Sequence, residues 1–151
     1  MPSIIYTMIQ RIQSLYLLMT FLISGVLSFL IILWKNFSGI EYYLMLLIKE
    51  DSWELVSIPV GFILSAILSL LALMNFKNRI VQIKLNRFNL VTNLYLLGIF
   101  VYLLLSLSGE NFISEKGIGL FLPVIVIVLL VLTNKAIQKD EELVKSVDRL
   151  R

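Results

Sequence analysis

Apolar residues are concentrated in four stretches of this chain, and none of the four contains a charged residue. They cover residues 12–34, 55–76, 88–109 and 117–134, with lengths between 18 and 23 residues. An α-helix rises about 1.5 Å per residue and the hydrocarbon core of a bilayer is about 30 Å thick, so roughly 20 apolar residues cross it. The pattern predicts an all-α fold with four transmembrane helices in one membrane domain over residues 1–151.

The positive charges predict how these helices are oriented. Ten of the 13 Lys and Arg residues lie before the first span, in the connection 77–87 and in the tail 135–151, and the other three are Lys35, Lys49 and Lys116. Lys and Arg are enriched in cytoplasmic segments of membrane proteins. We therefore expect a multi-pass, up-down bundle with both termini in the cytoplasm, an outer loop at 35–54 and a cytoplasmic helical extension at the C-terminus.

The first span is expected to stay in the protein as an anchor. Its apolar run is longer than the 7–15 residues usual for a signal peptide, and no small-x-small cleavage site follows it. Met8 is a plausible alternative start, which would make the preceding residues an extension of little consequence.

Composition and residue types narrow the chemistry. The chain is 59% hydrophobic and 15% charged, whereas soluble domains carry about 25% charged residues. Cys and His are both absent, which excludes disulfides, thiolate chemistry, His-ligated haem and most zinc or copper sites. The spans hold no ionisable group that could act as acid or base. We expect no enzyme activity, no cofactor and no metal, and a net charge of +3 gives no reason to expect a nucleic-acid partner.

Small residues recur on the first two spans, where they let membrane helices approach closely. In the second span they repeat every four residues, and in the first they cluster. The predicted helix-packing residues are Ser24, Gly25, Ser28, Gly61, Ser65 and Ser69. We predict that they pack the first two spans against each other, and the alternative is a docking face for a partner's helix.

Two prolines lie within the predicted spans. Pro59 is expected in the first turn of the second span, where its missing N–H would have no intrahelical partner. Pro123 is expected inside the fourth span, which it would bend.

A few polar residues lie at the inner ends of the second and third spans. They are Asn75, Asn89, Thr92 and Asn93. Asn89 and Asn93 share one helix face because they are four residues apart. The favoured interpretation is a cluster of hydrogen bonds between helices, and the alternative is a polar vestibule for a substrate.

The cytoplasmic segments hold the most distinctive polar sequence. The basic loop 77–87 is expected to attract anionic lipid headgroups, and it could form a helix lying flat on the membrane. The tail carries a narrow apolar stripe on a helix that continues the fourth span, which is also typical of a docking helix. The predicted partner-binding residues are Arg11, Gln13, Arg79, Gln82, Lys84, Arg87, Lys139, Leu143, Val147, Arg149, Leu150 and Arg151.

The outer loop contains an apolar segment, residues 40–48, that is too short to span the membrane. We expect an interfacial helix or a cap over the outer end of the bundle. A partner surface is the alternative, because an exposed apolar patch of that size often marks one.

Three cytoplasmic segments resemble a known family. They read MIQRIQSLYLL at Met8–Leu18, NRIVQIKLNR at Asn78–Arg87 and NKAIQKDEELVKSVDRLR at Asn134–Arg151. They are similar to the signatures of an uncharacterised family of small four-span inner-membrane proteins of the Bacteroidetes, domain-of-unknown-function family 4293. The resemblance implies an inner-membrane location and brings no activity with it.

These observations favour one function and leave a second open. The first is a non-enzymatic accessory or scaffolding subunit of a larger inner-membrane complex, which would contact another integral membrane protein through its cytoplasmic loop and tail. The second is a small homo-oligomeric transporter or channel whose path would be lined by Asn75, Asn89, Thr92 and Asn93. The bilayer itself, with anionic headgroups, is the other expected partner.

Overall fold

The computed structural model of the protein describes the backbone of residues 2–35, 38–106 and 115–150, and the side chains within 12–35, 38–106 and 117–150. Most of the described chain is helical. Four of its helical segments are long and apolar enough to cross a membrane: Ile12–Leu30, Trp53–Met74, Arg79–Ser106 and Ile118–Arg149. They overlap the four predicted spans and differ from them mainly at their ends.

The first span is built from three consecutive helical pieces. They are α1 (Pro2–Leu22), the π-helical turn η1 (Ile23–Leu27) and α2 (Ser28–Leu30). Two buried hydroxyls near the π turn donate to carbonyls four residues earlier: Thr20 Oγ1 to Tyr16 O at 2.9 Å and Ser24 Oγ to Thr20 O at 2.7 Å. Such bonds compete with the backbone ladder and accompany local changes in helix winding.

A short turn joins the second and third spans, α4 (Trp53–Met74) and α5 (Arg79–Ser106). The amide of Asn75 closes α4, because its side-chain Nδ2 donates to Leu71 O at 2.8 Å. Since α5 already begins at Arg79, most of the predicted basic loop 77–87 is the first part of this helix. The expectation of a separate helix lying flat on the membrane is therefore wrong.

The fourth span consists of the 3₁₀ turn η2 (Ile118–Phe121) followed by α6 (Leu122–Arg149). The structure confirms that the tail continues the fourth span, because α6 runs without interruption to Arg149. Pro123 lies in the first turn of α6, while Pro59 is the residue inside a helix, seventh in α4. The two prolines thus have the opposite roles to those predicted, because α4 starts earlier and α6 later than the apolar runs indicate.

The fold also contains three very short β-strands, which the sequence did not predict. The antiparallel sheet has the strand order β2 (Glu41–Tyr42), β1 (Trp34–Lys35), β3 (Glu115–Lys116). Trp34 is paired with Tyr42 on one side, where their rings stack with centroids 5.5 Å apart, and with Lys116 on the other. Gly117 comes directly after β3 and lies against the backbone of Ile32. A Cβ on Gly117 would collide with the Ile32 carbonyl oxygen.

The apolar segment 40–48 folds over one end of the bundle. Its short helix α3 (Leu44–Leu47) buries Leu44 and Leu47 completely, in the same core as Phe62 and Phe100. The structure therefore supports the cap, and it leaves the neighbouring Met45 exposed.

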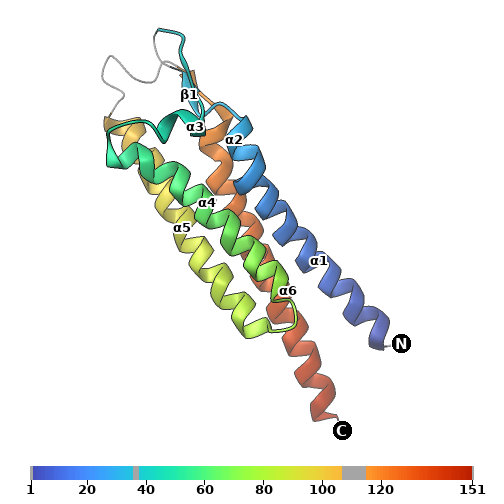
Figure 1. The fold of residues 1–151 in the computed structure, drawn as a ribbon. Coiled ribbons are helices and arrows are strands. Elements are labelled where there is room, and N and C mark those ends of the chain that lie inside the picture. The colour runs from blue at the N-terminus through green and yellow to red at the C-terminus, as the bar shows by residue number, and fades with distance from the viewer. Residues whose placement is uncertain (1, 36–37, 107–114, 151) are drawn as a thin grey trace.

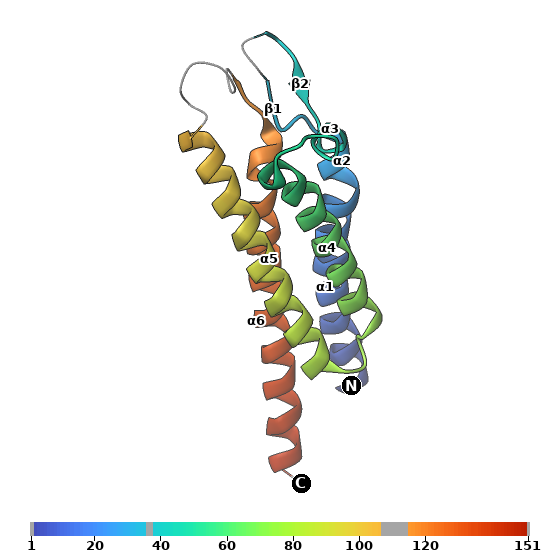
Figure 2. The same ribbon diagram turned by 60° about the vertical axis from the view of Figure 1, so that its left-hand side comes forward.

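Figures 1 and 2 show both ends of the chain at one end of the bundle, next to the turn between α4 and α5. We call this the terminal end. It is defined by that turn, Asn75–Asn78, by the start of α1 and by the end of α6. The three strands and α3 lie at the opposite end, which we call the loop end (Figure 2). In both views α6 extends past the other helices at the terminal end.

Candidate functional site: a polar interior

The interior of the bundle is polar where its outside is apolar. Asn89 and Asn93 on α5 are completely buried, whereas Phe88 and Val91 on the other side of the same helix are 57% and 61% exposed. Water would favour the reverse arrangement. Lipid favours this one, because hydrogen-bonding groups in a hydrocarbon environment need partners inside the protein.

A network of amides and hydroxyls joins α4 to α5. Asn89 Nδ2 donates to Ser69 Oγ at 2.8 Å and to the Ser65 carbonyl oxygen at 3.2 Å. Asn93 Nδ2 donates to Ser65 Oγ and to Asn89 Oδ1, both at 2.9 Å. These bonds support the interpretation of Asn89 and Asn93 as a cluster of hydrogen bonds between helices.

The other two residues predicted for this cluster lie outside it. Thr92 Oγ1 donates to Phe88 O of its own helix at 3.1 Å, and Asn75 caps the end of α4. Neither bond crosses between helices, so the cluster consists of two asparagines and two serines.

The small-residue stripe of α4 faces the third span. Besides the bonds from Ser65 and Ser69 to α5, a Cβ on Gly61 would lie 2.6 Å from Leu96 Cδ2. This stripe therefore pairs with the third span, while the predicted packing of the first two spans is present at Gly25. In a low-dielectric interior, the bonds between the asparagine amides of α5 and the serine hydroxyls of α4 favour the pairing of these two helices. The spacing of small residues in the sequence does not identify α5 as the partner.

The first span contacts α4 beside that stripe. A Cβ on Gly25 would lie 3.3 Å from Ala66 Cβ, which is tighter than most real contacts, so the two helices approach closely here because Gly25 has no side chain. Ser24 and Ser28 are buried but donate within their own helix, to Thr20 O and Ser24 O respectively.

A buried ion pair ties α5 to α6 at the terminal end. Arg79 Nη2 lies 2.9 Å from Asp140 Oδ2, and the Asp140 side chain is completely buried while Arg79 is 25% exposed. One turn further into the bundle, Gln82 Nε2 donates to the Ala72 carbonyl oxygen at 3.1 Å. Asn86 Nδ2 donates to Asn134 Oδ1 at 3.2 Å, again between α5 and α6. The polar interior thus reaches from Asp140 to Asn93.

Several buried side-chain atoms in this interior have no well-aligned hydrogen-bond partner among the described residues. They are Gln13 Nε2, Asn86 Oδ1, Asn93 Oδ1 and both oxygens of Asp140. For Asp140 Oδ2 the short distance to Arg79 makes the contact an ion pair, but the guanidinium N–H does not point along it. The Asp140 carboxylate is therefore held mainly by charge, which makes it sensitive to loss of its partner.

Sequence reasoning overlooked Asp140 because the tail was expected to extend into the cytoplasm, outside the core of the bundle. The signal was present in the spacing: Val126, Leu130, Thr133, Ile137 and Asp140 are separated alternately by four and three residues, and all are buried. On α5 the same spacing runs through Gln82, Asn86, Asn89 and Asn93. Continuing each stripe past the apolar run would have placed these side chains in the core.

The structure divides the predicted partner-binding residues into two groups. Gln13 and Gln82 are buried and Arg79 is in the ion pair, so these three serve the interior. The side chains of Arg11 and Arg151 lie outside the described residues. The remaining ones are exposed at the terminal end: Lys84, Arg87, Lys139, Leu143, Val147, Arg149 and Leu150.

The acidic side chains within the described ranges are too scattered to form a metal site. No three of them gather closely enough to hold a metal ion. The interior groups that come together are amides, hydroxyls and one ion pair, which can orient helices and bind each other. These groups can therefore hold helices together in the interior of a bundle whose outer surface is apolar.

The comparisons with known proteins place the chain in a family. Residues 9–150 match the model of a family described as Domain of unknown function (DUF4293). The chain belongs to this family. No match was found among curated proteins or among solved structures. The family's description names no activity, so function has to be argued from the geometry of the fold.

Proposed function

We propose that this member of the DUF4293 family is a multi-pass inner-membrane protein that acts as a non-enzymatic accessory or scaffolding subunit. In this proposal its helices cross the bilayer in alternating directions, with the terminal end in the cytoplasm. A second integral membrane protein binds there, through the projecting part of α6 and the basic residues beside it. The four apolar helices and the concentration of Lys and Arg near the terminal end support this orientation.

One observation carries the proposal: the last part of α6 has left the bundle but keeps an apolar stripe. Asp140 is the last buried residue of the helix, and beyond it Leu143, Val147 and Leu150 are 40%, 46% and 89% exposed. Their spacing of four and three residues places them on one face. An amphipathic helix of this kind typically binds by laying its apolar face into a groove of a partner.

Exposed basic residues lie in the same half of the bundle as this stripe. They are Lys84 and Arg87 near the start of α5 and Lys139 on α6. At a cytoplasmic membrane surface, each Lys or Arg contributes about 1 kcal/mol of attraction to anionic lipid. The same charges would hold the projecting helix near the bilayer, where another membrane protein presents its own cytoplasmic surface.

We prefer this function to a small transporter because of how the polar interior is used. A substrate path would need Asn89 and Asn93 to face open space. Their Nδ2 groups instead donate to Ser65, Ser69 and Asn89 within the bundle. Flux of a solute into proteoliposomes, lost on replacing Asn89 and Asn93, would reverse this preference.

The test is purification of a tagged protein from its own membranes in a mild detergent, with quantitative mass spectrometry. We expect one membrane protein at a constant stoichiometric ratio, and we expect its recovery to fall at least tenfold when Leu143, Val147 and Leu150 are all replaced by Ser. The matched control replaces Glu142 and Lys145, exposed on the same helix segment, by Gln. A partner retained by the Ser variant, or a protein that purifies alone, would contradict the proposal.

A further inference from the structure

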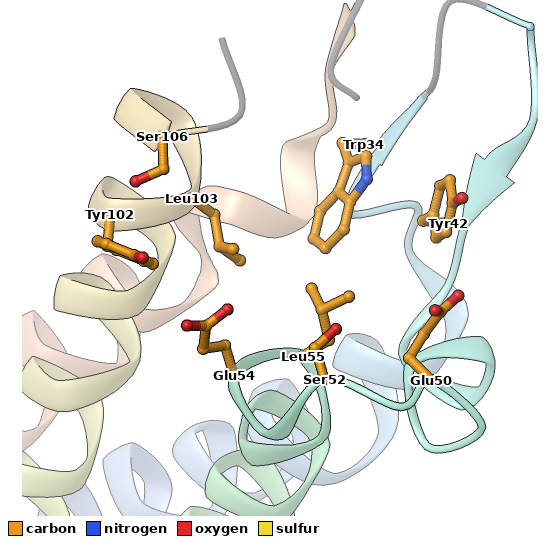
Figure 3. A pocket seen from close by; sticks show the side chains of 9 residues that line it. All are labelled: Trp34, Tyr42, Glu50, Ser52, Glu54, Leu55, Tyr102, Leu103 and Ser106. Atoms are coloured by element: carbon orange, nitrogen blue, oxygen red, sulfur yellow. The ribbon is translucent and has the colours of Figure 1, made fainter. Parts of the chain in front are cut away.

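A cavity of about 180 Å³ opens at the loop end, between the end of α5, the start of α4 and the strands. Figure 3 shows its lining: Tyr102, Leu103 and Ser106 on one side, Trp34 and Tyr42 on the other, and Glu50, Ser52, Glu54 and Leu55 below. The Trp34 ring and the Glu54 carboxylate point into the space between them. The cavity is far from the terminal end and from the polar interior.

Its charge has one sign. Glu50 and Glu54 are the only carboxylates among the described lining residues, and none of these residues is Lys or Arg. Neither carboxylate has a salt-bridge partner within the described ranges, whereas the nearby Glu41 is paired with Lys35 at 3.0 Å. Two uncompensated carboxylates beside a partly apolar cavity favour a cationic ligand.

Three aromatic rings border the same space. Trp34 and Tyr42 stack on each other on the strand side, and Tyr102 lies across from them on α5. Aromatic faces attract ammonium groups, by about 0.5–1 kcal/mol in exposed sites and about 2 kcal/mol or more when the cation is desolvated. A cavity of this size accommodates an ammonium group with two or three carbons.

An apolar groove continues from the cavity along α4 and α5. It measures about 480 Å³ and is lined by Trp53, Glu54, Tyr95, Gly98, Ile99 and Tyr102, so it shares Glu54 and Tyr102 with the cavity. Gly98 borders open space: a Cβ at this position would meet nothing within 4 Å. The groove lies on the helices that are long and apolar enough to span the bilayer, where acyl chains would surround them.

We propose that the cavity and groove together bind one bilayer lipid with an ammonium headgroup. The ammonium group lies between Glu50, Glu54 and the aromatic rings, and an acyl chain follows the groove past Gly98. The shared residues Glu54 and Tyr102 are placed where the head of such a lipid meets its tail. Trp and Tyr side chains prefer this depth, the boundary between hydrocarbon and water. The proposal concerns the loop end and does not depend on the function proposed for the terminal end.

The experiment reconstitutes the full-length protein in nanodiscs with equal amounts of phosphatidylethanolamine and phosphatidylglycerol, which differ in the presence of the amine. Lipid retained by the protein after mild extraction is measured by native mass spectrometry. We expect the amine lipid to exceed the glycerol lipid at least fivefold. In the E50Q/E54Q variant we expect the ratio to fall to about one, and in Gly98→Leu we expect loss of retained lipid altogether.

Two matched variants guard against general damage. Asp51→Asn removes an exposed acid next to Glu50 that does not line the cavity, and Gly98→Ala adds a Cβ for which there is room. Both should retain the wild-type ratio. A ratio near one in the wild type, or a ratio unchanged by E50Q/E54Q, would overturn the proposal. So would retention in Gly98→Leu together with displacement of the bound amine by millimolar ethanolamine, because the ligand would then be a soluble amine.

Discussion

Replacing Arg79 by Gln should destabilise the bundle far more than replacing its partner. The change leaves the carboxylate of Asp140, which is completely buried, without its only charged partner among the described side chains. Asp140→Asn removes the charge itself. Arg79 is 25% exposed, so in that variant the guanidinium can turn towards water.

The magnitude follows from the burial of the pair. Removing one member of a buried ion pair costs about 3–5 kcal/mol, because the remaining charge stays desolvated. Since Arg79 is partly exposed, water already screens the pair, and we expect about 2–3 kcal/mol for Arg79→Gln. For Asp140→Asn we expect about 1 kcal/mol, because only a neutral amide is then left buried without a partner. The double variant should resemble Asp140→Asn alone, because no charge is then left buried.

The assay is thermal unfolding of the purified protein in one detergent, followed by the fluorescence of its two tryptophans. At about 2–4 °C per kcal/mol for a chain of this size, Arg79→Gln should lower the midpoint by roughly 4–12 °C. The matched control is Arg87→Gln, an exposed basic residue two turns further along α5, which should change the midpoint little. Equal losses for Arg79→Gln, Asp140→Asn and the double variant would refute the reasoning, because they would show that no charge is left uncompensated.

Two other predictions concern packing and pH. Gly61→Ala should be about 1–3 kcal/mol less stable than Gly98→Ala, because only the first Cβ meets a buried side chain, Leu96, and any gain in helix propensity is common to both. Equal unfolding midpoints would contradict this close approach. The hydrogen bond from the Tyr43 hydroxyl to Glu41 lowers the pKa of Glu41 below its usual 4.5 and raises the pKa of Tyr43 above its usual 10.0; Lys35 also lowers that of Glu41. A lowered carboxyl pKa stabilises the fold above the unfolded value, and a raised phenol pKa stabilises it below the unfolded value. Tyr43→Phe should therefore lower the midpoint between these two pH limits, and the difference from wild type should vanish in stronger acid and stronger alkali; a difference independent of pH would contradict it.

The sequence predicted the long elements well because their signal is local. An uncharged run of about 20 residues identifies a membrane-spanning helix without reference to the rest of the chain. The continuation of the fourth span into the tail could be predicted for the same reason, since its apolar stripe keeps a helical spacing. The boundaries were less accurate: α5 begins nine residues before its apolar run, because Lys84 and Arg87 can remain exposed on a helix end.

Helix partners could not be predicted in the same way. In a membrane, lipid is as apolar as a protein core, so hydrophobicity does not tell which face of a helix is buried. From the sequence, the stripe of Gly61, Ser65 and Ser69 could have packed against any neighbouring helix. The structure shows that it packs against α5, because the amides of Asn89 and Asn93 bond to the two serine hydroxyls. The three two-residue strands gave no periodic signal at all, because strands that short have no pattern to detect.

The sequence alone therefore determined the number of helices long and apolar enough to cross a membrane, and the helical tail, since composition acts within one segment. The tertiary structure decided that Asp140 is buried against Arg79, that α4 pairs with α5 through serines and asparagines, and that Glu50 and Glu54 share a cavity with Trp34. Each of these depends on residues far apart in the chain, and a polar group in an apolar environment takes whichever partner the packing of whole helices brings within reach.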